Sequence, residues 1–196
     1  MLESLESLNH SLFLLINAGA HPPQALYLFA WLSAEGLIYI LAAALAIGWL
    51  RGNTKTRWTL VYAGLVATTA LLINRLIGLV WYHPRPFEIG LGHTLSAHTP
   101  ETSFPSDHAT VFFSITLALL FRPRLRVWGL ILVPVSLLVA WSRVWLGIHY
   151  PLDILGSLIV SGMVVAVLNR PLITVSDWLN TVAEKLISSL SARLLK

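Results

Sequence analysis

Three short stretches of this sequence place histidine, arginine, serine and aspartate next to long apolar segments. They are "WYHPRPF" with Arg85, "FPSDHAT" with Ser106, Asp107 and His108, and "SRVWLGIHYPLD" with Arg143, His149 and Asp153. Polar groups are costly beside a bilayer and usually mark a functional site. Arginine offers planar donors that match phosphate oxygens, and a helix N-terminus offers free N–H groups to an anion. The combination predicts a phosphate-binding site that contains two histidines.

The two histidines are predicted to have different chemical roles. Pro151 is a typical first-turn proline, so a helix is expected to start just after His149 and to place Asp153 in its first turn. A carboxylate there can accept a hydrogen bond from one ring nitrogen of His149, which fixes the tautomer and frees the other nitrogen to attack phosphorus. His108 is then predicted to protonate the leaving group and later to activate water.

The predicted phosphate-binding residues come from all three stretches and from the apolar segment before them. Ser106 follows a proline and is a good N-cap, so the unpaired amides of the next helix should lie beside it. Asp107 either tunes His108 or caps this helix. Arg75 lies deeper and must face a partner or a cavity. The predicted set is Arg85, Ser106, Arg143, Asp107 and Arg75.

Each of these residues also has an ordinary structural explanation when it is taken alone. Ser106 could only cap a helix, and Asp153 could only complement a helix dipole. Arg143 could extend its charge to the membrane interface. The functional interpretation depends on their coincidence at one membrane face. Three further histidines lie in the predicted loop 83–105 between two apolar segments and are interpreted as loop residues without zinc-site spacing: His83, His93 and His98.

The elements that must position these residues are membrane helices. The chain has 196 residues, of which 56% are hydrophobic and only 11% charged, whereas a soluble domain has about 25% charged residues. Apolar segments near residues 35–50, 58–82, 107–121, 127–146 and 152–169 are long enough, or nearly so, to cross about 30 Å of hydrocarbon. The predicted fold is all-α, a polytopic membrane helical bundle of about five transmembrane helices.

Residues 1–34 are predicted to form helices along the membrane surface, with a break near Ser33 and Glu35 that keeps this acid at the interface. An additional crossing in this region is an open alternative. Residues 35–170 form the transmembrane core, and 171–196 an amphipathic tail. One domain is expected. Ten of the thirteen basic residues fall in 51–57, 122–126 and 170–196, which predicts that this side is cytoplasmic and that the three polar stretches face outward.

The motifs "RP", "PS-x-H" and "SR-x(5)-H-x(3)-D" resemble those of the type 2 phosphatidic acid phosphatase superfamily, over about residues 74–156. The resemblance implies a helical membrane bundle and metal-independent phosphate transfer without a cofactor. It implies that His149 is the nucleophile that forms a phosphohistidine, that Asp153 orients it and that His108 is the general acid and base. Arg85, Ser106 and Arg143 would bind the phosphate.

Two positions depart from the family pattern. The first motif of the family carries a lysine where this chain has Gly78, so either a contact is missing or another cation such as Arg75 replaces it. The usual "PSGH" is "PSDH" here, with Asp107 in place of glycine. These departures and the "HPRPF" run resemble the bacitracin-resistance branch, the undecaprenyl-diphosphate phosphatases of bacterial envelopes.

This resemblance implies hydrolysis of undecaprenyl diphosphate at the outer face of the bacterial cytoplasmic membrane, which recycles the lipid carrier for peptidoglycan synthesis. The expected partners are the lipid diphosphate and membrane lipids, not nucleic acid. Alternatives within the family are a phosphatase for phosphatidylglycerol phosphate or phosphatidate, and a transferase from undecaprenyl diphosphate to lipid A. An alternative of another class is a non-enzymatic lipid carrier, which would have no need of a histidine oriented by an acid.

Overall fold

The computed structural model describes residues 2–96 and 98–194, and all regular secondary structure in them is helical. The order of elements is α1 (Leu2–Ile16), α2 (Gln24–Trp31), a π-helical turn η1 (Leu32–Gly36), α3 (Leu37–Arg51), α4 (Thr54–Val80), a 3-10 turn η2 (Pro86–Ile89), α5 (Asp107–Leu120), a 3-10 turn η3 (Pro123–Leu125), α6 (Arg126–Trp145), α7 (Pro151–Val167) and α8 (Asn169–Leu194).

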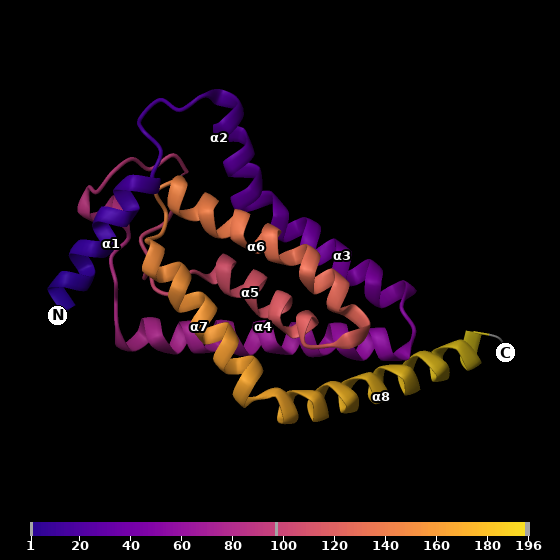
Figure 1. Ribbon diagram of the computed structural model, residues 1–196. Helices are drawn as coiled ribbons and strands as arrows, with labels where there is room; N and C mark the ends of the chain where they lie inside the picture. The colour runs from indigo at the N-terminus through magenta and orange to yellow at the C-terminus, as the bar shows by residue number, and fades with distance from the viewer. Residues whose placement is uncertain (1, 97, 195–196) are drawn as a thin grey trace.

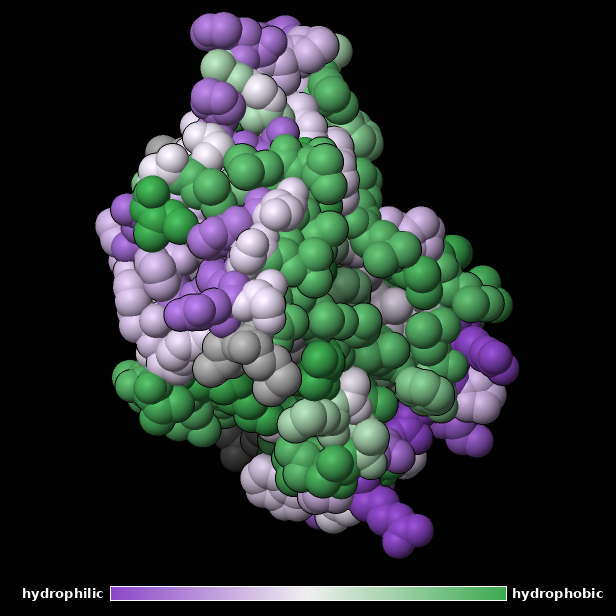
Figure 2. Space-filling model, turned by 60° about the vertical axis from the view of Figure 1, so that its left-hand side comes forward, coloured by the Kyte–Doolittle hydropathy of each residue, from purple (hydrophilic) through white to green (hydrophobic). Residues whose placement is uncertain are grey.

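Helix α5 is the central element of the bundle, and it packs against α4, α6 and α7 (Figure 1). Its side chains are largely buried, and Phe112, Ile115 and Leu119 contribute to the main hydrophobic core. The outer helices expose leucine, isoleucine and valine side chains. Figure 2 shows these apolar residues as a broad belt, with hydrophilic residues gathered on either side of it. This distribution is that of a helical bundle surrounded by lipid.

Three helical segments in the described residues are long and apolar enough to cross a membrane: Gln24–Arg51, Thr54–Val80 and Pro123–Trp145. Helices α7 and α8 would together add a fourth span if the pair forms a single broken crossing, with a bend of 74° between them. With 14 residues, α5 is only about 21 Å long, too short to cross alone. The predicted all-α membrane bundle is therefore confirmed, and the predicted number of about five spans is approximate.

The predicted break near Ser33 is wrong, because the helix from Gln24 to Arg51 continues through that point. A π turn interrupts its α-helical register there, and the amide of Leu37 donates to the carbonyl of Leu32. A π turn adds one residue without ending the helix, so the side chains that follow it face a different direction. Glu35 lies within this turn and contacts Arg143 at the polar end of the bundle.

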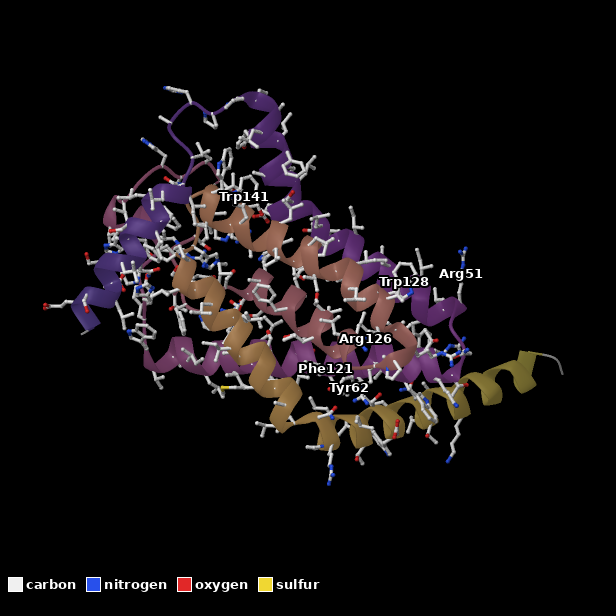
Figure 3. The ribbon with its side chains drawn as sticks, in the orientation of Figure 1. Arg51, Tyr62, Phe121, Arg126, Trp128 and Trp141 are labelled. Atoms are coloured by element: carbon white, nitrogen blue, oxygen red, sulfur yellow. The ribbon has the colours of Figure 1, made fainter. Side chains whose placement is uncertain are left out.

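The two ends of the bundle differ in charge. Arg51 and Arg126 lie at the end opposite to Trp141 (Figure 3). α8 begins near that basic end and packs against α4, where the Ser176 hydroxyl donates to the Trp58 carbonyl at 2.8 Å. The other end carries α1, which packs against α6 and α7.

Candidate active site

The predicted site residues lie where four helix ends meet, at the α1 end of the bundle (Figure 1). α4 and α6 end there, while α5 and α7 begin there. A cavity of about 150 Å³ opens between them. It is lined by Asn74, Arg75, Arg85, His98, Glu101, Thr102, Phe104, Pro105, Asp107, His108, Arg143 and His149. The structure thus brings both predicted histidines and all three predicted arginines to one cavity, with Ser106 and Asp153 buried beside it.

The loop that carries His149 is folded back over the end of α6. The amides of Ile148 and His149 both donate to the Arg143 carbonyl, at 3.1 and 3.3 Å. Gly147 makes this reversal with a φ of +80°, and a Cβ atom there would collide with the backbone of His93. α7 then starts at Pro151, as the sequence predicts. The loop therefore fixes His149 next to Arg143, six residues before it in the chain.

His149 is buried, and its two ring nitrogens have different partners. Nδ1 lies 2.9 Å from the backbone carbonyl of Ser103. A carbonyl can only accept, so Nδ1 carries the proton and Nε2 keeps its lone pair. Nε2 lies 3.4 Å from Nη1 of Arg85. Burial, together with the charges of Arg85 and Arg143, lowers the pKa of His149 well below its ordinary value. A neutral imidazole with a free Nε2 is a suitable nucleophile.

Asp153 has a fully buried carboxylate close to this ring. Its Oδ2 accepts from the Ser103 hydroxyl at 2.5 Å and from the Tyr150 amide at 2.8 Å. The distance from Oδ2 to His149 Nδ1 is 3.4 Å, longer than a usual N–H···O bond. The sequence predicted a direct hydrogen bond between the two residues, but Ser103 bridges them instead. Its carbonyl accepts from His149 Nδ1, and its hydroxyl donates to Asp153 Oδ2 and lies 3.4 Å from Nδ1.

The two arginines of the motifs are both buried at the cavity wall. The Arg85 Nε donates to the Glu101 carbonyl at 3.1 Å, and its backbone amide donates to Glu88 Oε2 at 2.7 Å. Burial lowers the pKa of the Arg85 guanidinium from its ordinary value, while the carboxylates of Glu101 and Asp153 oppose the shift. Arg143 is only 1% exposed. In the part of the chain that the structure describes, Arg143 Nε has no hydrogen-bond partner. Two buried guanidinium groups beside one cavity can bind an anion strongly.

Arg143 contacts two residues that the sequence reasoning did not place in the site. Its Nη1 lies 2.6 Å from Glu35 Oε1, and its Nη2 lies 3.2 Å from Nε2 of His98. The other carboxylate oxygen of Glu35 is 3.9 Å from Nε2 of His108. Glu35 thus lies between an arginine and a histidine of two different motifs.

The N-terminus of α5 presents unpaired groups beside the cavity. Ser106 occupies the N-cap position, as predicted, but its side chain makes no capping bond. Its Oγ is buried and has no hydrogen-bond partner among the described residues. The hydroxyl and the first helical amides remain available to an anion.

Asp107 and Arg75 form a polar contact between α5 and α4. Asp107 Oδ1 accepts from the Asn74 amide at 2.9 Å, and its Oδ2 lies 3.6 Å from Nη2 of Arg75. Gly78, one turn along α4 from Arg75, faces Thr102, whose Cγ2 would lie 2.7 Å from an added Cβ. A lysine at this position would require Thr102 to move, whereas Arg75 already lines the cavity.

The residues that the sequence reasoning missed share one property, which is that their partners are distant in the chain. They are Glu35, Asn74, His83, His98, Glu101 and Ser103. His83 lies in a loop, as predicted, but it is buried, and its Nδ1 is 3.7 Å from Asp153 Oδ1. Glu35 had a detectable signal, because it is the single acid in the long apolar helix before Arg51. An acid inside a membrane helix usually has a specific partner.

Comparison with known proteins agrees with this geometry. Residues 58–172 match the model of the PAP2 superfamily, and they contain all three motifs. The chain belongs to the PAP2 superfamily. The PAP2 match begins at residue 58, so Glu35 lies outside the matched residues.

Among PAP2 proteins, the chain is 41% identical to undecaprenyl-diphosphatase BcrC of Bacillus subtilis over 79% of both chains. It is 38% identical to the putative undecaprenyl-diphosphatase YbjG of Escherichia coli, over 82% of this chain and 80% of the relative. The crystal structure of Aquifex aeolicus LpxE has the same fold, with a TM-score of 0.64 and 24% identity over 86% of this chain and 94% of that one. The protein is therefore a membrane phosphatase of the PAP2 type.

Proposed function

We propose that this PAP2 phosphatase hydrolyses undecaprenyl diphosphate to undecaprenyl phosphate and inorganic phosphate. The observation that carries the proposal is the unprotonated Nε2 of His149 in a cavity with Arg85, Arg143 and His108. The names of the similar proteins in Bacillus subtilis and Escherichia coli supply the lipid. The polar end of the bundle would face the outside of the bacterial cytoplasmic membrane, because the basic loops lie at the opposite end.

In the first half of the proposed reaction, His149 Nε2 attacks the terminal phosphorus in line with the bridging oxygen. The P–N bond forms as the bond from phosphorus to that oxygen breaks, and His108 gives its proton to the departing lipid phosphate. Arg85, Arg143, the Ser106 hydroxyl and the amides of α5 would stabilise the charge on the three equatorial oxygens. Asp153 and Ser103 would hold the His149 ring in place.

In the second half, His108 takes a proton from water, and the hydroxide attacks the phosphohistidine. Inorganic phosphate leaves, and His149 returns to its neutral form. We assign Asp107 to holding Arg75 and Asn74, because an ionised carboxylate has no proton to donate to phosphate. Arg75 would supply the cation that the family lysine supplies elsewhere. The guanidinium groups and helix amides carry the charge stabilisation, so the proposed reaction requires no metal.

The test is phosphate release by the purified protein from a panel of lipids in detergent micelles. We expect undecaprenyl diphosphate to be the best substrate, ahead of phosphatidylglycerol phosphate and phosphatidate, with no transfer to added lipid A. His149→Ala should abolish release, EDTA should leave the wild type active, and vanadate should inhibit it. A substrate labelled in its terminal phosphate should leave acid-labile, base-stable label on the wild-type protein. Preference for another lipid, or loss of activity in EDTA, would contradict the proposal.

A further inference from the structure

Glu35 is the one acid of the long N-terminal apolar helix, and it contacts two of the proposed catalytic groups. We propose that Glu35 is a positioning residue that is shared between Arg143 in the empty site and His108 in the occupied site. When the substrate phosphate binds Arg143, it displaces the Glu35 carboxylate, which then pairs with His108 and holds the proton that His108 donates. This inference rests on the proposed function.

The local structure places a carboxylate at this point of the helix. The π turn Leu32–Gly36 contains Glu35, and its backbone is continuous with the helices on both sides. π turns inside α-helices often occur at functional sites, because the added residue redirects one side chain. The hydroxyl of Ser33 donates to the Phe29 carbonyl at 2.7 Å, as a second donor beside the Leu32 amide. The helix thus keeps an acid in an apolar segment and directs it toward Arg143 and His108, which line the cavity.

The empty site needs an anion next to Arg143. This guanidinium is 1% exposed, and an unpaired buried charge is strongly unfavourable. Glu35 Oε1 supplies the counter-charge at 2.6 Å. Arg143 Nε has no hydrogen-bond partner among the described residues, so the guanidinium still has donor capacity. A phosphate that uses this capacity would stand close to the Glu35 carboxylate.

Two anions on one guanidinium repel each other, so the binding of phosphate favours a movement of Glu35. The other near group is His108, whose Nε2 is 3.9 Å from Glu35 Oε2, just beyond hydrogen-bond distance. A small rotation of the carboxylate would close that gap. The side chain of Glu35 is 29% exposed and can rotate, whereas that of Asp153 is fully buried.

The movement would deliver negative charge to the histidine that must carry a proton. Besides His108 itself, the charged and titratable groups that line the cavity are Arg75, Arg85, His98, Glu101, Asp107, Arg143 and His149. Arg143 disfavours an imidazolium at His108, while a carboxylate at hydrogen-bond distance favours it. The Asp107 carboxylate contacts Asn74 and Arg75, so the carboxylate that faces His108 Nε2 is that of Glu35.

Glu35→Gln in the full-length protein tests the inference, because glutamine keeps the size and removes the charge. We expect kcat to fall by at least about tenfold, since the general acid is weakened. Vanadate should inhibit the variant at several-fold lower concentration, because no carboxylate competes for Arg143. The basic limb of the pH–kcat profile should move to lower pH, because His108 loses its proton more easily. Glu3→Gln, the same change on exposed α1, should leave all three quantities unchanged.

A second variant separates the two positions of the carboxylate. Glu35→Asp keeps the charge but is one methylene shorter. We expect its vanadate inhibition to resemble that of the wild type more closely than that of Glu35→Gln, with a lower kcat because the carboxylate no longer reaches His108. Gel filtration of each variant in detergent shows whether the bundle is intact.

The proposed movement of Glu35 between Arg143 and His108 would be overturned if Glu35→Gln lowered kcat and also weakened vanadate inhibition, because a merely structural role requires both. It would also be overturned if the variant changed neither quantity. If the wild type releases no phosphate from lipid diphosphates, the proposed function fails. In that case, the competition between Glu35 and an anion at Arg143 can still be tested. Vanadate binding to the wild type and to Glu35→Gln would then be measured by thermal shift.

Discussion

Ser103 connects His149 and Asp153 of the third motif, and removal of its hydroxyl tests how these two residues are held. Its carbonyl accepts from His149 Nδ1 at 2.9 Å, and its hydroxyl donates to Asp153 Oδ2 at 2.5 Å. The hydroxyl also lies 3.4 Å from His149 Nδ1. Ser103→Ala removes both contacts of the hydroxyl, whereas the backbone carbonyl remains. The variant therefore isolates the support that the hydroxyl gives to the carboxylate and to the ring.

The expected magnitude follows from the partners of Asp153. Its Oδ2 has two donors, the Ser103 hydroxyl and the Tyr150 amide, and its Oδ1 has no partner among the described residues. Ser103→Ala leaves a fully buried carboxylate with one donor. A hydrogen bond to a charged group is worth about 1.5–3 kcal/mol. If the carboxylate stabilises the positive ring of His149 during attack, this loss lowers kcat by about 10- to 150-fold.

The assay is phosphate release under saturating lipid substrate, with the apparent melting temperature measured in the same detergent. Ser161→Ala is the matched control. Ser161 is also buried, but its partners are neutral: its hydroxyl accepts from the Ser114 hydroxyl and donates to the Thr110 carbonyl. Both variants should lower the melting temperature. Ser103→Ala alone should lower kcat. The reasoning is refuted if the two variants have the same kcat, since the hydroxyl would then support folding only.

Three further predictions concern the wider site. Burial and two arginines lower the pKa of His149, so its neutral form should persist in acid. The acid limb of the pH–kcat/KM profile should therefore lie below about pH 6.5. A limb at or above that value would contradict the assignment of His149 as the nucleophile. Gly78→Lys should reduce the yield of folded protein because its Cβ meets Thr102, and adding Thr102→Ala should restore it; equal yields of the single and double variants would reject the steric explanation. The chain has no cysteine, so Thr99→Cys and Lys55→Cys can be labelled singly in intact cells; an impermeant maleimide should reach only Thr99→Cys, and the reverse pattern would invert the topology.

The parts of the site that could be predicted are those fixed by short-range spacing. His149 follows Arg143 through one loop, and Asp153 follows His149 in the first turn of α7. Pro151 sets the start of that helix, and Ser106 sets the start of α5, so each motif indicates its own geometry. The basic loops indicate which helix ends lie together. These local rules were sufficient to place the two histidines and three arginines at one end of the bundle.

The contacts that could not be predicted depend on how distant segments are aligned. Glu35 and Arg143 are 108 positions apart in the sequence. Their contact involves a π turn that no sequence pattern predicts. The hydroxyl of Ser103 replaces a direct bond that the spacing of His149 and Asp153 suggests. Its position depends on the path of an irregular loop, where side chains far apart in sequence determine the fit. The helical membrane bundle was predictable from composition, but the break at Ser33 was not real, because a π turn tolerates a polar residue without ending the helix.

The two histidines have surroundings that suit two different demands. A nucleophile needs one fixed lone pair, and His149 is buried with Nδ1 held by the Ser103 carbonyl. A group that donates a proton and later accepts one must change its charge twice in each cycle, so its partner must be able to move. His108 lies at the cavity wall, and the carboxylate nearest to its Nε2 is the partly exposed Glu35. A rigid neighbour would favour one protonation state of His108 and would slow the half-reaction that needs the other.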